Sequence, residues 1–356
     1  MASPALERQL VTFTLDGATV TGRKGQTILQ AMQAHRKNVP HLCHDPRLDP
    51  YGGCRTCVVE VEGEPRPVPS CATPVTHGMV IHSRSENIED QRKTLIELLM
   101  MEHLGGAGDG VGEDDLALLA REYDAQPLFK LESHRKPYLD RNEFIGLDPD
   151  NCMLCNRCVR YCDEVMLCSA LTLTDKGPGG HIQPTRGASF LDTDCELCGG
   201  CVSTCPTGAL YDKRALGTRD GEVDKTTTTC TYCGVGCQLD LHVETNKIVK
   251  VGTKIGAPVS EGNLCVKGRF AFDFVDHPDR LTAPLIRNDK GELVEASWDD
   301  ALDRIAKGFQ GVGDRHGPQA LALLTSSRCT NEENYLLQKL ARGVLETNSV
   351  HSCAAT

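Results

Sequence analysis

Residues 152–162 read CMLCNRCVRYC, and residues 195–206 read CELCGGCVSTCP. Both stretches place four cysteines in the spacing C-x2-C-x2-C-x3-C, so they form an internal repeat. Cysteines two or three residues apart bring their thiolates onto one tight loop, and a soft site with several iron atoms needs that arrangement. The repeat therefore predicts iron–sulfur clusters in the middle of the chain.

The repeated stretch resembles the run of bacterial two-cluster ferredoxins, in which the fourth cysteine of each run binds the cluster of the other run. Pro206 follows the second run as it does in those ferredoxins, whereas Asp163 follows the first. The resemblance implies two [4Fe–4S] clusters with crossed ligands. One set is Cys152, Cys155, Cys158 and Cys205, and the other is Cys195, Cys198, Cys201 and Cys162.

Two further sets of four cysteines flank this repeat. They are Cys43, Cys54, Cys57 and Cys71 before it, and Cys230, Cys233, Cys237 and Cys265 after it. Gly52 and Gly53 stand just before Cys54, where the backbone must approach sulfur closely and donate N–H bonds to it. Zinc stays open as an alternative for the first set, because four thiolates also suit zinc.

The residues before the first set predict a hairpin followed by a helix. Apolar and polar residues alternate over 9–22 around an Asp16-Gly17 turn, and a capping-box pattern at Thr27–Gln30 opens a helix to about Arg36. Together with the cysteine loop they resemble the β-grasp [2Fe–2S] domain that begins the complex I large iron–sulfur subunit, iron-only hydrogenases and NAD-linked formate dehydrogenases. The resemblance implies a [2Fe–2S] cluster here and favours it over zinc.

The last set lies in CTYCGVGC (230–237) and GNLCVKGRF (262–270). These stretches resemble the N-terminal [4Fe–4S] domain of molybdenum or tungsten bis-pterin oxidoreductases, formate dehydrogenases above all. In that family the lysine two residues after the last cysteine relays electrons between cluster and pterin. The resemblance assigns this role to Lys267, whose alternative is an ordinary solvated surface lysine.

We therefore expect an α+β multidomain iron–sulfur protein. Its predicted domains are a β-grasp [2Fe–2S] domain (1–85), a helical linker with a degenerate His-Cys cluster region (86–145), a two-cluster [4Fe–4S] ferredoxin domain (146–222), the [4Fe–4S] domain of the molybdopterin oxidoreductase fold (223–285) and the truncated start of a molybdopterin-binding α/β domain (286–356). Apolar spacing predicts helices over 86–104, 116–123, 298–309 and 331–345 and a strand over 320–324, and 226–229 reads as a polar linker.

Charge and hydrophobic content limit the kinds of partner and compartment that we expect for this chain. The 38 Lys and Arg residues against 49 Asp and Glu give a formal net charge of −11, which argues against a nucleic-acid surface. No stretch has the roughly 18 consecutive apolar residues of a membrane helix. The start, MASPALERQL, carries no export signal, so we expect reduced, metal-binding thiols in the cytoplasm.

Across nearly the whole chain, the order of modules resembles the α subunit of NAD-linked formate dehydrogenases. The resemblance implies that the full-length enzyme interconverts formate and CO2 at a molybdenum or tungsten bis-pterin guanine dinucleotide. Electrons would pass Lys267, the Cys230 set, the two ferredoxin clusters and the Cys43 set. They would leave to a flavin and iron–sulfur subunit that reduces NAD, or to another soluble acceptor. We expect the chain alone to be inactive on formate.

The sequence departs from this family at one place. Many relatives hold a further cluster with one His and three Cys after the first long helix. His103 stands at that place, but the residues that follow, GGAGDGVGEDDLALLAREY (105–123), contain no cysteine. We predict that this cluster is absent, that His103 is an ordinary helix-end residue, and that 105–115 is a solvated connection.

Residues 347–356 read TNSVHSCAAT. In formate dehydrogenases a similar Thr-Asn-x-Val-x-x-Cys-Ala-x-x segment directly precedes the selenocysteine or cysteine that binds the metal. The chain would then end one residue before that ligand, which suggests a selenoprotein reading frame cut at a UGA codon. Coincidental truncation is the alternative, and the codon after Thr356 decides between them.

Three cysteines stand alone, and a lone cysteine is more often a small buried hydrophobe than a ligand. They are Cys168, Cys329 and Cys353. Competing functions are a complete, non-catalytic electron-transfer subunit, a complex I large-subunit-like protein, a hydrogenase-associated protein and a zinc-binding regulator. The intact Cys230 set, Lys267 and the 347–354 stretch favour formate dehydrogenase.

Overall fold

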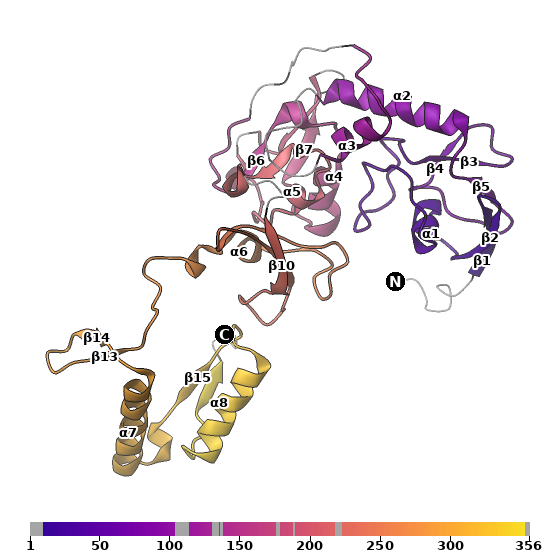
Figure 1. The fold of residues 1–356 in the computed structure, drawn as a ribbon. Coiled ribbons are helices and arrows are strands. Elements are labelled where there is room, and N and C mark those ends of the chain that lie inside the picture. The colour runs from indigo at the N-terminus through magenta and orange to yellow at the C-terminus, as the bar shows by residue number, and fades with distance from the viewer. Residues whose placement is uncertain are drawn as a thin grey trace. The chain divides into compact units, whose positions relative to one another are not determined.

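The computed structural model describes residues 10–103, 114–129, 135, 138–175, 179–187, 189–217 and 223–352. The predicted connection after His103 and the end of the TNSVHSCAAT stretch lie largely outside these residues. The chain divides into two compact units, one of residues 1–224 with 242–244 and the other of residues 225–241 with 245–356 (Figure 1). Each unit is described by itself.

The first unit begins with a mixed five-stranded sheet in the order β2-β1-β5-β3-β4. Its strands are β1 (Leu10–Leu15), β2 (Ala18–Arg23), β3 (Val58–Val61), β4 (Val68–Pro69) and β5 (Val80–His82). β1 pairs antiparallel with β2 and parallel with β5. The β1–β2 turn is the predicted Asp16-Gly17, whose positive φ angles of 48° and 82° suit a two-residue hairpin.

Helix α1 (Ile28–Ala34) packs on this sheet, as the β-grasp prediction requires. Thr27 and Gln30 form the predicted capping box, which satisfies free backbone N–H groups at the start of the helix. Its apolar side chains join Phe13 and Ile81 in one buried core. The helix ends two residues before the predicted Arg36, which adopts a left-handed φ of 58° that no helix can continue.

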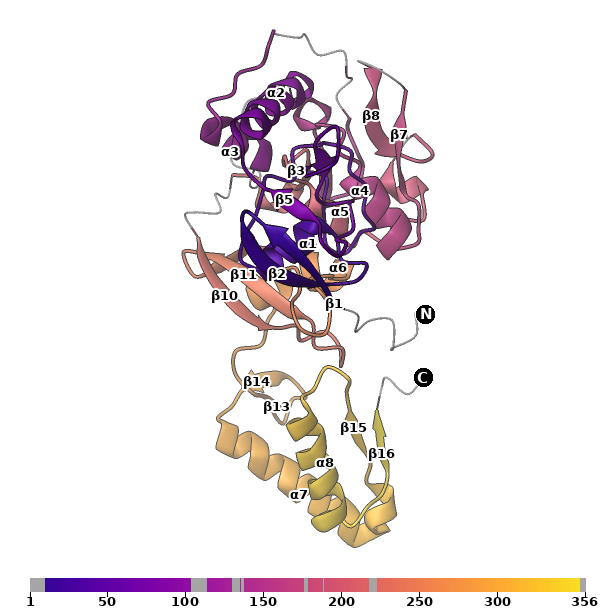
Figure 2. The same cartoon turned by 90° about the vertical axis from the view of Figure 1, so that its right-hand side faces the viewer.

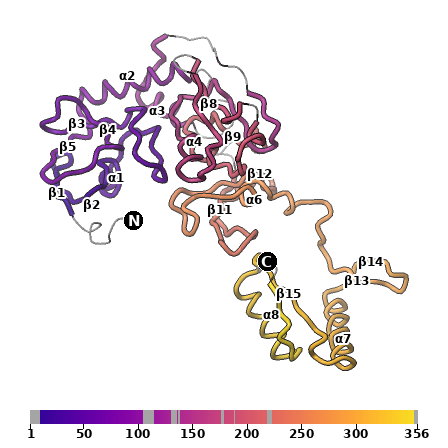
Figure 3. Tube along the Cα trace, turned by 180° about the vertical axis from the view of Figure 1, so that it is seen from behind, coloured from indigo at the N-terminus to yellow at the C-terminus, as the bar shows by residue number. Residues whose placement is uncertain are grey.

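Two helices follow the sheet, and Figure 3 traces the chain from β5 into them. They are α2 (Glu86–Glu102) and α3 (Asp115–Glu122), close to the predicted 86–104 and 116–123. Arg92 of α2 is fully buried and donates to the carbonyls of Val58 and Ser83 over 2.7 and 2.9 Å. These hydrogen bonds tie α2 to the sheet, while Glu89 of the same helix pairs with the guanidinium over 3.0 Å.

The rest of the first unit is a small, doubled arrangement of short elements (Figure 2). β6 (Ile145–Leu147) pairs antiparallel with β9 (Leu210–Asp212), and β7 (Leu171–Thr174) pairs antiparallel with β8 (His181–Pro184). Helices α4 (Arg157–Arg160) and α5 (Gly200–Thr204) each begin after the second cysteine of their run. The sequence repeat is therefore also a structural repeat.

The second unit opens with a three-stranded sheet in the order β10-β11-β12 and a short helix. They are β10 (Asp224–Thr229), β11 (Gln238–Glu244), β12 (Lys247–Gly252) and α6 (Val266–Phe270). The prediction that 226–229 is a linker was wrong, because these four threonines form most of β10. Threonine is β-branched and suits a strand, and Thr227 Oγ1 donates to Asp240 Oδ1 on β11 over 2.6 Å.

The remainder of the second unit is the start of the predicted α/β domain. Its elements are β13 (Leu285–Arg287), β14 (Leu293–Glu295), α7 (Trp298–His316), β15 (Leu323–Thr325), α8 (Asn331–Gly343) and β16 (Val350–Ser352). β15 and β16 are parallel and α8 connects them, which is one βαβ unit. Helix α7 runs seven residues beyond its predicted end at Phe309. Within the described residues, no helix combines the length and apolar character needed to cross a membrane.

Candidate metal centres

The first cysteine set, called the Cys43 site, is assembled and buried. It consists of Cys43, Cys54, Cys57 and Cys71. The backbone N–H of Cys54 donates to Cys43 Sγ over 3.3 Å, and the N–H of Cys43 donates to Cys54 Sγ over 3.4 Å. Hydrogen bonds from Cys54 and Cys71 lower the pKa of the Cys43 thiol, and a hydrogen bond from Cys71 lowers that of Cys57 to about 7. The four sulfurs therefore lie close enough together to hydrogen-bond with one another and to shift one another's pKa values.

The loop that carries this site has the close backbone approach predicted from its glycines. Gly52 adopts a φ of 67°, and the Gly53 N–H hydrogen-bonds to the Cys43 sulfur. A Cβ at Gly53 would stand 2.4 Å from the ring of Tyr51, so a larger residue there would have to displace that ring. Backbone N–H groups aimed at sulfur stabilise thiolates that bind iron.

The second group, called the Cys152 site, brings together residues from both repeated runs. A cavity is lined by Cys152, Cys155, Cys158 and Cys205, together with Met153 and Ile182. Leu154 and Asn156, on either side of Cys155, have φ angles of 58° and 60°. This strained turn directs Cys155 inward, and the combination of four cysteines matches the crossed set expected from the sequence.

The third group, called the Cys195 site, comprises Cys195, Cys198, Cys201 and Cys162. Burial raises the pKa of Cys162 and of Cys195, and the negative charge of the neighbouring Cys198 thiolate raises both further. The N–H of Leu197 donates to Cys195 Sγ over 3.3 Å, and that of Gly200 donates to Cys198 Sγ over 3.4 Å. Cys201 is buried on α5, three residues after Cys198.

Sequence reasoning missed the placement of Cys168, which was interpreted as a lone apolar residue. Its thiol hydrogen-bonds with that of Cys162, and its N–H donates to the carbonyl of Cys162 over 3.0 Å. Leu167 and Ser169 on either side have φ angles of 55° and 45°. The short separation between Cys162 and Cys168 could have indicated that the two are neighbours, but this spacing fits no known run of cluster ligands.

The fourth group, called the Cys230 site, lies in the second unit. Cys230, Cys233, Cys237 and Cys265 are near one another, and burial and then the neighbouring thiols raise the pKa of Cys230. Cys233 and Cys265 are exposed, unlike the cysteines of the Cys43 site. Lys267 lies in the first turn of α6, two residues after Cys265, and is exposed. A Cβ on Gly268 would stand 3.6 Å from Cys230 Sγ, so the helix backbone closely flanks this site.

The donor chemistry of the Cys152 site fits a cationic metal cofactor. Burial raises the pKa of Cys152 to about 11 and that of Cys155 to about 12, so these thiols stay protonated without nearby positive charge. Metal coordination deprotonates such thiols outright. Among the described residues, no group of three His, Cys, Asp or Glu side chains has the geometry of a site for one metal ion.

His103 lies at the end of α2, as predicted. Its Nε2 lies 2.5 Å from Asp114 Oδ2 at the start of α3, and its Nδ1 is buried without a hydrogen-bond partner. Nearby, the buried Arg135 donates from Nη1 to the carbonyl of Cys152 over 2.6 Å and from Nη2 to Glu102 over 2.5 Å. The absence of a fifth cluster stays a prediction.

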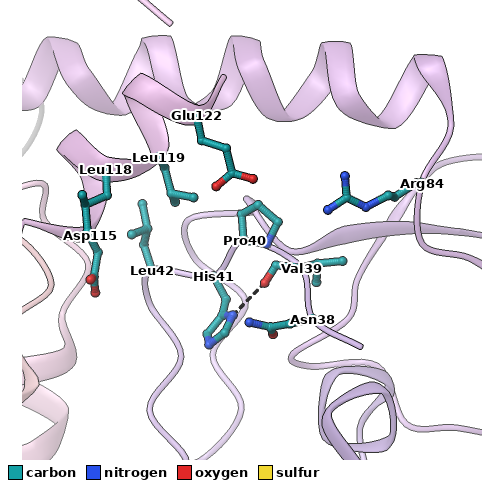
Figure 4. Close-up of a pocket in the computed structure, with 10 residues that line it drawn as sticks. All are labelled: Asn38, Val39, Pro40, His41, Leu42, Arg84, Asp115, Leu118, Leu119 and Glu122. Carbon is teal, nitrogen blue, oxygen red and sulfur yellow. Dashed lines mark hydrogen bonds between the residues drawn. The ribbon is translucent and has the colours of Figure 1, made fainter. Parts of the chain in front are cut away.

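A cavity of about 460 Å³ lies beside the Cys43 loop (Figure 4). It lies between residues 38–42 and α3, and its lining includes Arg84, Leu119 and Glu122. His41 Nδ1 is 2.8 Å from the carbonyl of Val39, which holds its ring in place along this wall. No member of the Cys43 site lines the cavity, so the site is separated from it by the 38–42 segment.

Family models match four successive parts of the chain. Residues 8–86 match a 2Fe-2S iron-sulfur cluster binding domain, and residues 142–211 match the ferredoxin-like domain of NADH-quinone oxidoreductase subunit 3. Residues 223–277 match the molybdopterin oxidoreductase Fe4S4 domain, and residues 280–355 match molybdopterin oxidoreductase. These matches confirm the predicted α+β fold class with its [2Fe–2S], ferredoxin-like and molybdopterin oxidoreductase domains.

Curated relatives match the chain from end to end. The NADPH-Fe(3+) oxidoreductase subunit alpha of Geobacter sulfurreducens is 33% identical over 96% of this chain and 40% of its own length. A Staphylococcus aureus protein named "Putative formate dehydrogenase SAR2393" is 28% identical over 97% of this chain and 39% of its own length. The chain thus spans about 40% of the length of these relatives.

A solved structure is similar to part of the chain. A chain in the crystal structure of an NAD+-reducing [NiFe]-hydrogenase is 32% identical, with a TM-score of 0.50. The match covers 57% of this chain and 87% of that chain. By its four matched segments, the chain carries a 2Fe-2S domain and a ferredoxin-like domain, followed by the Fe4S4 domain and a segment of molybdopterin oxidoreductase.

Proposed function

We propose that the four cysteine sites hold one [2Fe–2S] and three [4Fe–4S] clusters and conduct electrons through the chain. The observation that carries this proposal is the Cys152 site, where one cavity collects cysteines from both ferredoxin-type runs. Such crossing is the ligand pattern of two-cluster ferredoxins. We propose the domain boundaries at 85, 145, 222 and 285 on the same basis.

The substrate that we propose for the whole protein is formate, with CO2 as product. A relative that bears the name of a formate dehydrogenase and the molybdopterin oxidoreductase match over 280–355 support this. When bound, a pterin-held molybdenum or tungsten centre supplies the two-electron chemistry. Lys267 is proposed to lie on the electron path between that centre and the Cys230 site, because it follows Cys265 on α6.

The partner that we propose is a flavin and iron–sulfur subunit that reduces NAD. The likeness to a chain of an NAD+-reducing hydrogenase covers 57% of this chain, and it supports a shared kind of acceptor. The Cys43 site is the proposed exit, because it lies at the opposite end of the cysteine series from Lys267. One-electron sites in series divide a two-electron oxidation into single steps.

The cluster content can be measured on the chain itself. Anaerobically purified protein should bind about 14 iron atoms per chain, as one [2Fe–2S] and three [4Fe–4S] clusters require. Its reduced form should show a [2Fe–2S] electron paramagnetic resonance signal that Cys57→Ser abolishes, with Cys329→Ser, at an exposed cysteine outside the four sites, as the control. Stoichiometric zinc with no iron would refute the proposal.

A second function is favoured by the relative named NADPH-Fe(3+) oxidoreductase subunit alpha. In that case electrons would come from NADPH through a partner and flow towards another acceptor. The protein isolated from its own host with its associated subunits separates the two functions. Bleaching of the cluster absorbance by formate supports formate oxidation, whereas bleaching by NADPH alone supports the second function.

A further inference from the structure

The guanidinium of Arg157 lies between the Cys43 loop and the ferredoxin-like part of the first unit. Its Nε donates to Thr204 Oγ1 over 3.1 Å, and its Nη1 donates to the carbonyl of Leu42 over 3.2 Å. Its Nη2 lies 3.5 Å from Asp45 Oδ2. Arg157 is only 8% exposed, so these partners replace water around the charge.

The residues that Arg157 joins stand directly before proposed metal ligands. Leu42 precedes Cys43, and Thr204 precedes Cys205. Arg157 itself precedes the third cysteine of the first ferredoxin-type run. One side chain therefore connects the backbone beside the Cys43 site to both runs that supply the Cys152 site.

Asp45 holds this guanidinium in one position. Its side chain is fully buried and accepts from Thr204 Oγ1 over 2.7 Å. It also accepts from Nε and Nη2 of Arg47 over 3.0 and 2.7 Å, and the Arg47 guanidinium lies 5.0 Å from the centre of the Tyr161 ring. A buried carboxylate with two guanidiniums and a hydroxyl is a satisfied network, whose geometry is specific because any missing member leaves a buried charge unpaired.

Apolar contacts place the same two sites side by side. Cys43 and Cys54 belong to a buried group that contains Met153, and Cys155 packs against it. The buried group around Cys198 of the Cys195 site includes no described cysteine of the Cys43 site. Within the described part of the chain, the Cys152 site is therefore the apolar neighbour of the Cys43 site.

We propose that Arg157 is a positioning residue for electron transfer between the Cys152 site and the Cys43 site. With clusters bound, the Cys152 site would give up one electron and the Cys43 site would receive it. No bond forms or breaks, and neither a proton nor an outside reactant is required. The inference rests on the proposed function, because both sites must carry clusters.

The test replaces Arg157 by lysine, which keeps the charge but cannot reach Thr204, Leu42 and Asp45 together. The control is Arg141→Lys, since Arg141 is an exposed partner of Asp192 in the same part of the unit. After flash photoreduction, electron arrival at the Cys43 site should slow several-fold in Arg157→Lys, because the rate of electron transfer falls steeply as the distance between the two sites grows. The control should keep the wild-type rate.

Hydrogen exchange gives a second readout that does not depend on electron transfer. The Leu48 N–H donates to the carbonyl of Asp45, and the Arg47 N–H donates to its carboxylate. These amides should exchange faster in Arg157→Lys and in the milder Thr204→Val, but not in Arg141→Lys. If Arg157→Lys does not fold, the electron-transfer rate and the hydrogen exchange are both measured on Thr204→Val instead.

The outcomes separate this inference from the function beneath it. Wild-type protein without iron would overturn the proposed function and this inference together. Full iron content with unchanged transfer and exchange rates in Arg157→Lys and Thr204→Val would overturn the role of Arg157 alone. Slower transfer and faster exchange, with full iron content in both variants, would support it.

Discussion

In the second cysteine run, Gly200 stands where there is no room for a side chain. Gly200 begins α5, and a Cβ there would stand 1.9 Å from Cε1 of Tyr161. Tyr161 is 1% exposed and lies beneath the Arg47 guanidinium, so its ring cannot move aside. The N–H of Gly200 also donates to Cys198 Sγ. A side chain that displaced the Gly200 backbone would therefore also disturb the Cys195 site.

Gly200→Ala should therefore destabilise the first unit. Overpacking in a filled core costs about 1–3 kcal/mol, and we expect a value at the upper end because the ring is confined. Denaturant unfolding of the purified protein measures the change. Gly308→Ala is the matched control, since nothing lies within 4 Å of that position in α7. That substitution should instead stabilise its helix by roughly 0.5–1 kcal/mol. Equal stability of Gly200→Ala and wild type would contradict the packing argument.

At the scale of elements, α2 and α3 are joined through one carboxylate. Asp114 caps α3 by accepting from the N–H of Ala117 over 2.9 Å, and it also pairs with His103 at the end of α2. The side chain of His103 is 6% exposed, so its ring depends on this partner. A single residue thus fixes the end of one helix against the start of the next.

Asp114→Ala should lower the stability of the protein more than Asp114→Asn does. Asparagine keeps a good N-cap, whereas alanine loses it at about 1 kcal/mol and also leaves the buried ring without a partner. Thermal unfolding followed by circular dichroism compares the two variants with wild type. Identical midpoints for both variants would show that neither the cap nor the pair stabilises this junction.

At the scale of the whole molecule, the two units differ in how well their apolar surfaces are covered. The first unit buries a continuous core beneath its sheet, including Phe13 and Ile81. In the second unit, α7 has no buried residue, and Trp298, Leu302 and Ile305 are 71%, 55% and 53% exposed. An exposed apolar face of this kind is typical of a surface that contacts another segment or chain.

Trp298 is the only tryptophan of the chain, so its fluorescence reports on this face alone. We expect a solvent-exposed emission spectrum and efficient quenching by iodide for the chain as it stands. A dye that binds apolar surface should also bind, and Leu302→Gln with Ile305→Gln should reduce its signal. A blue-shifted spectrum that iodide does not quench would show that α7 is covered.

The sequence alone determined the cysteine sets, the hairpin and the caps of this protein. Ligand spacing within a run is local, because residues two or three positions apart share one loop whatever surrounds them. The Asp16-Gly17 turn and the Thr27 cap are local for the same reason, and the structure confirms both. Resemblance to ferredoxins supplied the crossing of Cys205 to the other run, which spacing alone does not contain.

Only the tertiary structure decided the features that depend on distant segments. The four threonines of β10 form a strand because β11 offers them a partner. Arg157 and Asp45 are 112 positions apart, and no periodicity connects them. Their burial against each other follows from packing one loop onto another, which is a property of the folded unit and not of either stretch.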